Sequence, residues 1–416
     1  MSGWKEFTLN EIVDFPPVVK LNRGHEYSFV KMEDISVGQR FVFPEEKKKK
    51  YENSSCSKFG NDDILFARIT PCLENGKIAQ VKLGKSNSGF GSTEFFVFRG
   101  KKEKLNQSFL FYLAKSDLIW KSAVNSMVGA SGRQRADSGF LGNLKFKIPL
   151  PAIQRKIAAV LSAYDDLIEN NNRRIAILEK MAEELYREWF VRLRFPGHEN
   201  VKIVKGVPEG WEVNELSTIC FEKRILVKKK NISDSTRYVG LEHITPRSMM
   251  IKEHGYATDI QSDKLFFSFG DILFGKIRPY LHKVAISHFD GVCSSDTIIV
   301  KVDNKECQAF AYLTISSDSF IDLATTSSTG TKMPRADWDF LKKQRILIPN
   351  DGLLKQFQKL FDVYFGAITN YQGRNDLLTT SRDRLLSRLM SGKIAVENLD
   401  IQFPASMKEE EVAAHA

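Results

Sequence analysis

Two turn segments carry residue types that suit contacts with a phosphate backbone or with base edges. They are GASGRQRAD (129–137) and SSTGTKMPRAD (327–337). Small residues let a backbone approach a ligand closely, and Arg and Gln can pair with guanine and adenine through two hydrogen bonds. The alternative is a solvated turn before a strand, in which the shared Arg-Ala-Asp makes a local salt bridge. The candidate DNA-contacting residues here are Gly132, Arg133, Gln134, Arg135, Thr331, Lys332 and Arg335.

A second pair of segments places basic residues around a predicted strand-turn-strand. They are FARITPCLENGKIAQV (66–81) and FGKIRPYLHKVAIS (274–287). The proline in each segment is interpreted as structural. The basic residues either contact DNA phosphates or remain exposed charges of a turn. The candidates from this pair are Arg68, Lys77, Lys276, Arg278 and Lys283.

No motif predicts catalysis or a metal site. The chain has no GxGxxG between a strand and a helix, no GxxxxGK[ST] and no HExxH. Its five cysteines are widely spread, and no Cys/His group has the spacing of zinc ligands. We therefore expect no catalytic residue and no metal ligand in this chain.

Most of the sequence occurs twice, which indicates how these segments are positioned. DDILFARITPCL at Asp62 matches GDILFGKIRPYL at Gly270, and RADSGFL at Arg135 matches RADWDFL at Arg335. The separation of matched residues drifts from 207 (Gly3 and Gly210) to 200 (the two arginines), as loop insertions would produce. A long repeat present only twice predicts a tandem duplication of one globular unit.

Each copy has a globule rich in short strands, at residues 1–150 and 196–350. Runs such as EFFVFRG and DTIIVKV are β-branched and aromatic and alternate with turn residues and a few helical pieces, so we predict mixed α+β domains. The lysine-rich run FPEEKKKKYENSS (43–55) is either a solvated protrusion or a loop facing DNA.

After each globule the apolar residues take a spacing of three and four, which predicts long helices at 151–195 and 351–394. The matched positions are all 200 residues apart, because one inserted residue would rotate every later side chain off the helix–helix interface. Three asparagines at 170–172 interrupt the pattern and either fix the register or bind a partner. The predicted helix-pair interface consists of Ile157, Val160, Tyr164, Ile168, Leu178, Leu185, Phe357, Leu360, Tyr364, Ile368, Leu378 and Leu385.

Connectivity predicts that the two helices are antiparallel and form a coiled coil. The second globule starts where the first helix ends, so a second helix that pairs with the first must run back along it. The globules would then lie at opposite ends, related by an approximate two-fold axis. A helix of about 40 residues is about 60 Å long, which exceeds one turn of duplex DNA at about 34–36 Å.

Bulk properties are compatible with a phosphate-rich partner but do not require one. The chain of 416 residues has 61 Lys and Arg against 51 Asp and Glu, a net charge of +10. No signal peptide and no apolar stretch of membrane-spanning length is found, so we expect a cytoplasmic protein without membrane contact. Residues 395–416 are predicted to be a C-terminal tail.

The order globule–helix–globule–helix, with IPLPAIQRKIAAVL (148–161) and the glycine-containing turn before it, resembles the specificity (HsdS) subunit of type I restriction-modification systems. The resemblance covers residues 1 to about 395, and the second copy, LIPNDGLLKQFQKL, lacks the second proline. It implies that each globule is a target recognition domain for one half of a bipartite site in double-stranded DNA. It also implies that the helices set the spacing and dock two modification (methyltransferase) subunits, which restriction (motor-nuclease) subunits join. AdoMet, ATP and Mg²⁺ would belong to those partners, with no cofactor in this chain.

Two other functions remain open from the residues alone. One is a self-contained DNA-modifying enzyme with an unrecognised catalytic motif, which AdoMet- or Mg²⁺-dependent activity of the isolated chain would indicate. The other is a protein-binding scaffold whose basic charge is incidental, which the absence of salt-sensitive DNA binding would indicate.

Overall fold

The computed structural model describes residues 4–44, 47–52, 55–84, 86–130, 132–330 and 332–407, with Asp259 described by its backbone only. The chain forms two compact units, and each unit combines one globule with half of each long helix. Unit 1 comprises residues 1–171 and 374–416, and unit 2 comprises residues 172–373. The mixed α+β class predicted from the sequence is confirmed.

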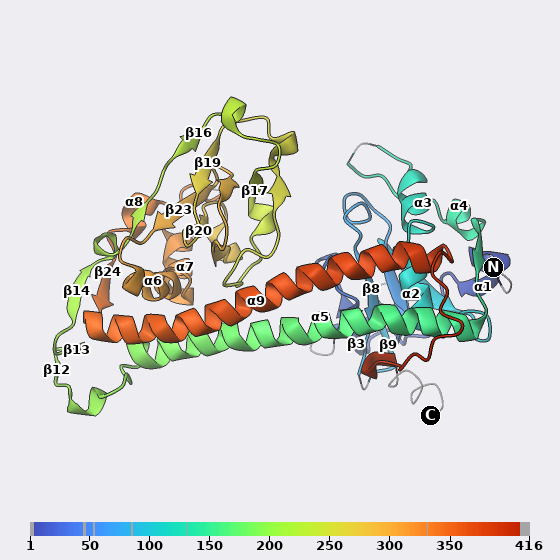
Figure 1. Cartoon of the computed structure of the whole chain (residues 1–416), viewed down its shortest axis with the longest axis horizontal. Coiled ribbons are helices and arrows are strands. Elements are labelled where there is room, and N and C mark those ends of the chain that lie inside the picture. The colour runs from blue at the N-terminus through green and yellow to red at the C-terminus, as the bar shows by residue number, and fades with distance from the viewer. Residues whose placement is uncertain are drawn as a thin grey trace. The chain divides into compact units, whose positions relative to one another are not determined.

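The globule of unit 1 is built on two sheets and four short helices (Figure 1). One sheet has the order β2 (Val13–Asp14), β10 (Phe95–Gly100), β7 (Ile64–Ala67), β8 (Ile78–Val81) and β4 (Phe41–Val42). The other has the order β5 (Lys48–Lys50), β3 (Glu26–Val30), β9 (Ser88–Gly91) and β6 (Ser57–Gly60). The remaining elements are the pair β1 (Lys5–Thr8) and β11 (Lys145–Ile148), with α1 (Leu9–Ile12), α2 (Gln107–Lys115), α3 (Trp120–Asn125) and α4 (Ser138–Gly142).

The globule of unit 2 repeats this plan. One sheet has the order β15 (Phe221–Glu222), β23 (Thr297–Lys301), β20 (Ile272–Gly275) and β21 (Val284–Ile286). The other has the order β16 (Leu226–Val227), β19 (Lys264–Phe267), β22 (Gly291–Cys293), β17 (Arg237–Val239) and β18 (Gly255–Tyr256). There are two further strand pairs, β14 (Glu212–Glu215) with β24 (Arg345–Ile348) and β12 (Ile203–Val204) with β13 (Val207–Pro208). The short helices are α6 (Gln308–Ile315), α7 (Asp318–Thr326) and α8 (Trp338–Leu341).

The strand registers of the two globules match residue by residue. Leu65 pairs with Ala79 in unit 1, and Leu273 pairs with Ala285 in unit 2. One parallel pair also recurs, β3 with β9 and β17 with β22. This equivalence of strand pairing is the structural form of the tandem repeat.

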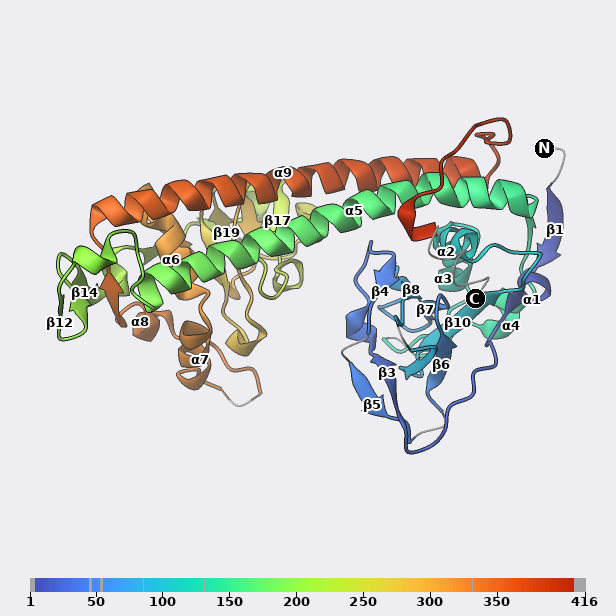
Figure 2. The same cartoon turned by 90° about the horizontal axis from the view of Figure 1, so that it is seen from below.

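Two long helices, α5 (Pro151–Tyr186) and α9 (Asp351–Met390), run side by side within each unit (Figures 1 and 2). Proline suits the first turn of α5 because its missing N–H has no partner there. The Asn350 side chain accepts a hydrogen bond from the Leu353 amide at the start of α9 (3.0 Å). A short π-helical segment, η2 (Arg187–Val191), continues α5.

Contacts within each unit show that the helices are antiparallel. In unit 1, the Asn171 side chain donates to that of Asn375 (2.9 Å) and Arg382 donates to Asp165 (2.6 Å), so the residue number rises on one helix as it falls on the other. In unit 2, Arg174 contacts the Tyr371 hydroxyl (3.2 Å), and the rings of Trp189 and Phe357 lie 5.6 Å apart, so the same relation holds. The predicted antiparallel pairing is thus confirmed within both units, and Asn171 is a buried polar contact of the helix pair.

The predicted helix-pair residues are buried to different depths. Ile157, Ile168, Phe357 and Ile368 are buried, and Leu178, Leu185, Leu378 and Leu385 are partly buried. Leu360, however, is 39% exposed, and Leu161 and Phe361 are more fully buried than Val160 and Leu360. Leu161 and Phe361 belong to apolar clusters that include residues of the globules, which accounts for their deeper burial, and the predicted helix-pair interface stays a prediction.

Part of the predicted C-terminal tail belongs to unit 1. Val396 and Met407 are buried in the same core as Leu386 and Leu389 of α9. The Lys156 ammonium on α5 donates to the backbone carbonyls of residues 397 and 399 (2.7 and 2.8 Å). Residues 408–416 lie outside the described part of the chain.

Candidate nucleic-acid interface

In unit 1 the Arg-Ala-Asp segment joins three pieces of the globule. Arg135 pairs through its backbone with Ile69 and Val128, and its guanidinium donates to both carboxylate oxygens of Glu94 (2.6 and 2.9 Å). Ala136 is 2% exposed, and the Asp137 carboxylate caps α4 by accepting from the Phe140 amide. The hydrogen bond from Arg135 lowers the pKa of the Glu94 carboxyl.

Unit 2 repeats this arrangement with looser geometry. Arg335 pairs through its backbone with Ile277 and Thr329, and its guanidinium lies 3.6 Å from the carboxylate of Asp296. Ala336 is 1% exposed, and Asp337 caps α8. The repeated motif therefore has a structural basis, in which the arginine pairs with an acid from another segment rather than with the aspartate of its own motif.

The turns before these motifs hold the remaining candidates at the surface. Gly132 has a left-handed φ of 79°, and Gly330 has a φ of 97°, so both turns use backbone conformations that favour glycine. Arg133 and Lys332 are exposed, whereas the Gln134 carbonyl accepts a hydrogen bond from the Thr70 amide (3.0 Å). Thr331 lies outside the described residues.

The two candidate segments of each unit are brought together. The Ala136 amide donates to the Arg68 carbonyl (2.8 Å), and the Ala336 amide donates to the Lys276 carbonyl (2.9 Å). Arg278 is exposed, has a left-handed φ of 52°, and its amide donates to the Pro334 carbonyl (2.8 Å). Each unit therefore carries a platform of basic residues on paired segments. We define platform 1 as Arg68 with 132–135 and platform 2 as Lys276, Arg278, Lys332 and Arg335.

Lys77 and Lys283 have a different setting from the other candidates. The Lys77 ammonium donates to the carbonyl of Met32 (2.9 Å), and the Lys283 ammonium donates to the carbonyl of Leu241. Burial lowers the pKa of the Lys283 side chain. These bonds tie equivalent strands to equivalent 3₁₀ turns, so both lysines have a structural role, and a DNA contact by either one stays a prediction.

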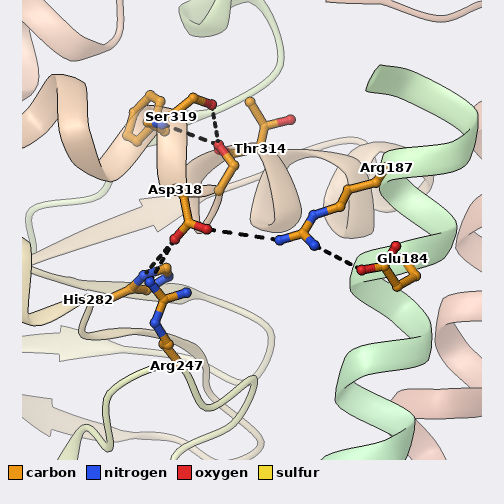
Figure 3. Close-up of polar contacts among 9 residues, drawn as sticks. Glu184, Arg187, Arg247, His282, Thr314, Asp318 and Ser319 are labelled. Atoms are coloured by element: carbon orange, nitrogen blue, oxygen red, sulfur yellow. Dashed lines mark hydrogen bonds and ion pairs between the residues drawn. The ribbon is translucent and has the colours of Figure 1, made fainter. Parts of the chain in front are cut away.

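A polar cluster in unit 2 was missed by the sequence analysis (Figure 3). Asp318, at the start of α7, accepts from Arg247 (2.7 Å) and lies 3.9 Å from Arg187 of η2 and 3.7 Å from the His282 ring. These side chains line a cavity of about 240 Å³. Burial lowers the pKa of His282.

The backbone beneath this cluster is strained in unit 2 only. Arg247 and His282 have left-handed φ values of 59° and 52°, whereas the equivalent residues of unit 1 are Gly38 (83°) and Gly76 (69°). Residues other than glycine are disfavoured in this conformation, because their Cβ atom crowds the backbone. A comparison of the two halves at these two glycines is the signal by which the sequence could have revealed the cluster.

No group of three or more His, Cys, Asp or Glu side chains that could hold a metal ion occurs among the described residues. None of the helices in the same part of the chain is both long and apolar enough to cross a membrane.

Residues 1–180 match the family model of the type I restriction modification DNA specificity domain. The chain is 26% identical over 310 residues to the specificity subunit of the type I restriction enzyme MjaIX of Methanocaldococcus jannaschii, a match that covers 72% of this chain and 71% of the relative. It is 34% identical over 158 residues to the EcoAI specificity subunit of Escherichia coli, covering 37% of this chain but only 26% of that protein.

Solved structures give a weaker likeness. The S subunit of a type I restriction-modification system from M. genitalium has a TM-score of 0.49 at 16% identity, covering 93% of this chain and 96% of that one. The HsdS subunit from Thermoanaerobacter tengcongensis has a TM-score of 0.38 at 15% identity, covering 94% and 98%. These scores are too low to support an argument, so the assignment rests on the sequence matches. By sequence, residues 1–180 match the DNA specificity domain of type I restriction modification systems, and the chain is similar over 72% of its length to a specificity subunit of such a system.

Proposed function

We propose that this chain selects the DNA sequence on which a type I restriction-modification enzyme acts, with platform 1 and platform 2 each reading one half of a bipartite site in double-stranded DNA. The observation that carries the proposal is the recurrence of one basic platform in two units of the same chain. A divided site needs two readers, and a duplicated unit supplies them. The divergent turns, GASGRQ in one unit and STGTKM in the other, would then read different half-sites.

The long helices suit a role as spacer and as docking surface for two modification subunits, which restriction subunits would join. Both helices are continuous through the point where one unit gives way to the other, so their length would set the distance between the half-sites. Exposed apolar side chains remain on them, such as Leu167 (53%), Ile177 (59%) and Leu377 (71%). Apolar residues that stay exposed on a helix are suited to a protein partner.

In this proposal the chain is not catalytic. AdoMet would be bound by the modification subunits, and ATP and Mg²⁺ by the restriction subunits. Because the substrate is cellular DNA, the assembly would act in the cytoplasm.

Methylated-base mapping tests the proposal directly. The chain is reconstituted with its modification subunits, and methylated adenines are mapped on genomic DNA. We expect a bipartite motif, of which Arg133→Ala with Gln134→Ala alters one half and Lys332→Ala alters the other. If each change affects both halves equally, or neither, the assignment of one platform to one half-site is wrong.

Binding across salt concentrations separates this function from the two alternatives. The isolated chain should bind duplex DNA weakly, with a logarithm of affinity that falls linearly with the logarithm of salt concentration. A scaffold would show no such binding, and a self-contained enzyme would modify DNA without added subunits.

A further inference from the structure

Unit 1 contains a groove beside platform 1 that the sequence does not reveal. Its volume is about 560 Å³. Its walls come from the segment 15–19, from 55–58 at the start of β6, from Thr93 and 95–97 at the start of β10, and from Arg68 and Ser138. Val18 at its rim is 86% exposed. The groove therefore opens to solvent next to residues already proposed to meet DNA.

Arg68 is held rigidly in this groove. Its amide donates to the Glu94 carbonyl (3.0 Å) and its carbonyl accepts from the Ala136 amide, so its backbone is fixed on both sides. Its guanidinium carbon lies 4.6 Å from the centre of the Phe96 ring. A guanidinium stacked on an aromatic face loses little further conformational freedom when it binds a ligand.

The Arg68 side chain also has unmet hydrogen-bonding capacity. Its Nε is buried and has no hydrogen-bond partner in the structure. Glu94 lies close enough for Arg68 to lower the pKa of its carboxyl, but both of its carboxylate oxygens accept from Arg135. A buried donor without a partner is destabilising, and an oxygen atom delivered by a ligand would satisfy it.

The charge of the groove selects the kind of ligand. Lys58 lines it together with Arg68, and the lining includes no carboxylate among the described residues. Thr93 and Ser138 add exposed hydroxyl groups. Two cations and hydroxyl donors around one cavity match the oxygens of a phosphate group, whereas a guanine edge offers a single pair of acceptors to one arginine.

We propose that this groove binds a phosphodiester of the DNA backbone, with Arg68 and Lys58 as its charged ligands. The proposal rests on the proposed function. A phosphate fixed here would set the register of the duplex against the neighbouring turn, while Arg133 and Gln134 read bases.

The equivalent position in unit 2 lacks this support. Lys276 takes the place of Arg68, and Ile298 on β23 takes the place of Phe96, because Ile298 pairs with Phe274 as Phe96 pairs with Phe66. Lysine is flexible and cannot stack on an aliphatic side chain, and its ammonium cannot donate the two parallel hydrogen bonds that a guanidinium can. The anchor is therefore a property of unit 1.

Salt-dependent binding of the full-length chain to a random-sequence duplex tests the proposal. We expect Arg68→Met and Lys58→Met each to reduce the slope of log affinity against log salt by about 0.9, the value for one lost phosphate contact. The loss should be the same on a duplex that carries the mapped methylation motif, so the preference for the motif stays unchanged. Lys121→Met is the matched control, since Lys121 is a surface residue of unit 1 that pairs with Asp117, and it should leave the slope unchanged.

Arg68→Lys separates a phosphate contact from base reading. It keeps the positive charge, so the slope on random DNA should be retained. The proposal is wrong if Arg68→Met and Lys58→Met have the same slope of log affinity against log salt as Lys121→Met. It is also wrong if Arg68→Lys loses affinity for the motif duplex but not for random DNA. If the unaltered chain shows no salt-dependent binding to either duplex, the proposed function itself fails and the anchor fails with it.

Discussion

A buried ion pair between the long helices of unit 1 should be among its most sensitive contacts. Arg382 of α9 donates to Asp165 of α5 at 2.6 Å, and the two side chains are 3% and 4% exposed. Asp165 also accepts from the Tyr112 hydroxyl, so both carboxylate oxygens are used. Arg382→Ala removes this cation from the buried carboxylate, which keeps the hydrogen bond from Tyr112 and its electrostatic interaction with Lys115.

The expected cost follows from that burial. Removing one partner of a buried pair destabilises a protein by about 3–5 kcal/mol, because the remaining charge stays buried without its ion-pair partner, whereas an exposed pair contributes about 0–1 kcal/mol. At about 1.4 kcal/mol per factor of ten, amide exchange from the core of unit 1 should become faster by roughly two to nearly four orders of magnitude. Lys121→Ala, which breaks an ion pair with side chains 58% and 65% exposed, is the control.

Unit 2 supplies the compensating change. The residues 200 positions from Asp165 and Arg382 are Phe365 and Ala182. Ala182 is buried in the apolar core of unit 2, and Phe365 is partly buried against that core. The double variant Asp165→Phe with Arg382→Ala should therefore be more stable than Arg382→Ala alone. Replacement of a buried ion pair by packed apolar residues is often neutral or stabilising.

Hydrogen exchange followed by mass spectrometry of peptides from each unit measures these effects separately. We expect faster exchange in unit 1 peptides of Arg382→Ala and a partial return in the double variant. An effect of Arg382→Ala no larger than that of Lys121→Ala would refute the assignment of a large stabilisation to this pair. So would a double variant less stable than the single one.

Three further outcomes can be checked. Asp337→Ala removes the cap of α8 and should lower the free energy of unfolding by about 1 kcal/mol, measured by urea titration. Arg247→Gly should be more stable than Arg247→Ala by about 1 kcal/mol in the same titration, because glycine relieves the left-handed strain while both variants lose the bond to Asp318. Burial lowers the pKa of His288 from 6.5 to about 4, so the unfolded chain binds a proton at this residue more readily than the folded chain does. The free energy of unfolding should therefore fall as pH drops from about 6.5 to about 4, and His288→Phe should make that fall smaller, measured by thermal unfolding.

The fold was predictable wherever the sequence repeats itself. The pair of Asp62 and Gly270 segments predicted equivalent strands, and β7–β8 and β20–β21 have the same register. The constant separation of 200 residues along the helices predicted two equivalent helices that pair without register slip. Internal comparison supplied this information because each half constrains the interpretation of the other. The two-fold relation between the units stays a prediction.

The chemistry of individual charged side chains was not predictable in the same way. Lys77 and Lys283 were interpreted as candidate phosphate contacts, yet their ammonium groups meet backbone carbonyls 45 and 42 residues away along the chain. The pairing of Asp165 with Arg382 was not predicted, because a helix pattern shows which residues are apolar but not which polar residues have a distant partner. The groove at Arg68 depends on strands that meet only in the folded chain.

The differences between the two units matter for a protein made by duplication. Because α5 and α9 share the same spacing of apolar residues, each could pair with a copy of itself in another chain as well as with the other. In such a pairing of α5 with α5, the register of unit 1 would place Asp165 opposite Ala182, and in a pairing of α9 with α9 it would place Arg382 opposite Phe365. Either arrangement buries one charge without its partner, at a cost of several kcal/mol, whereas the pairing of α5 with α9 satisfies both. A single asymmetric ion pair thus favours pairing of α5 with α9 over pairing of either helix with its own copy.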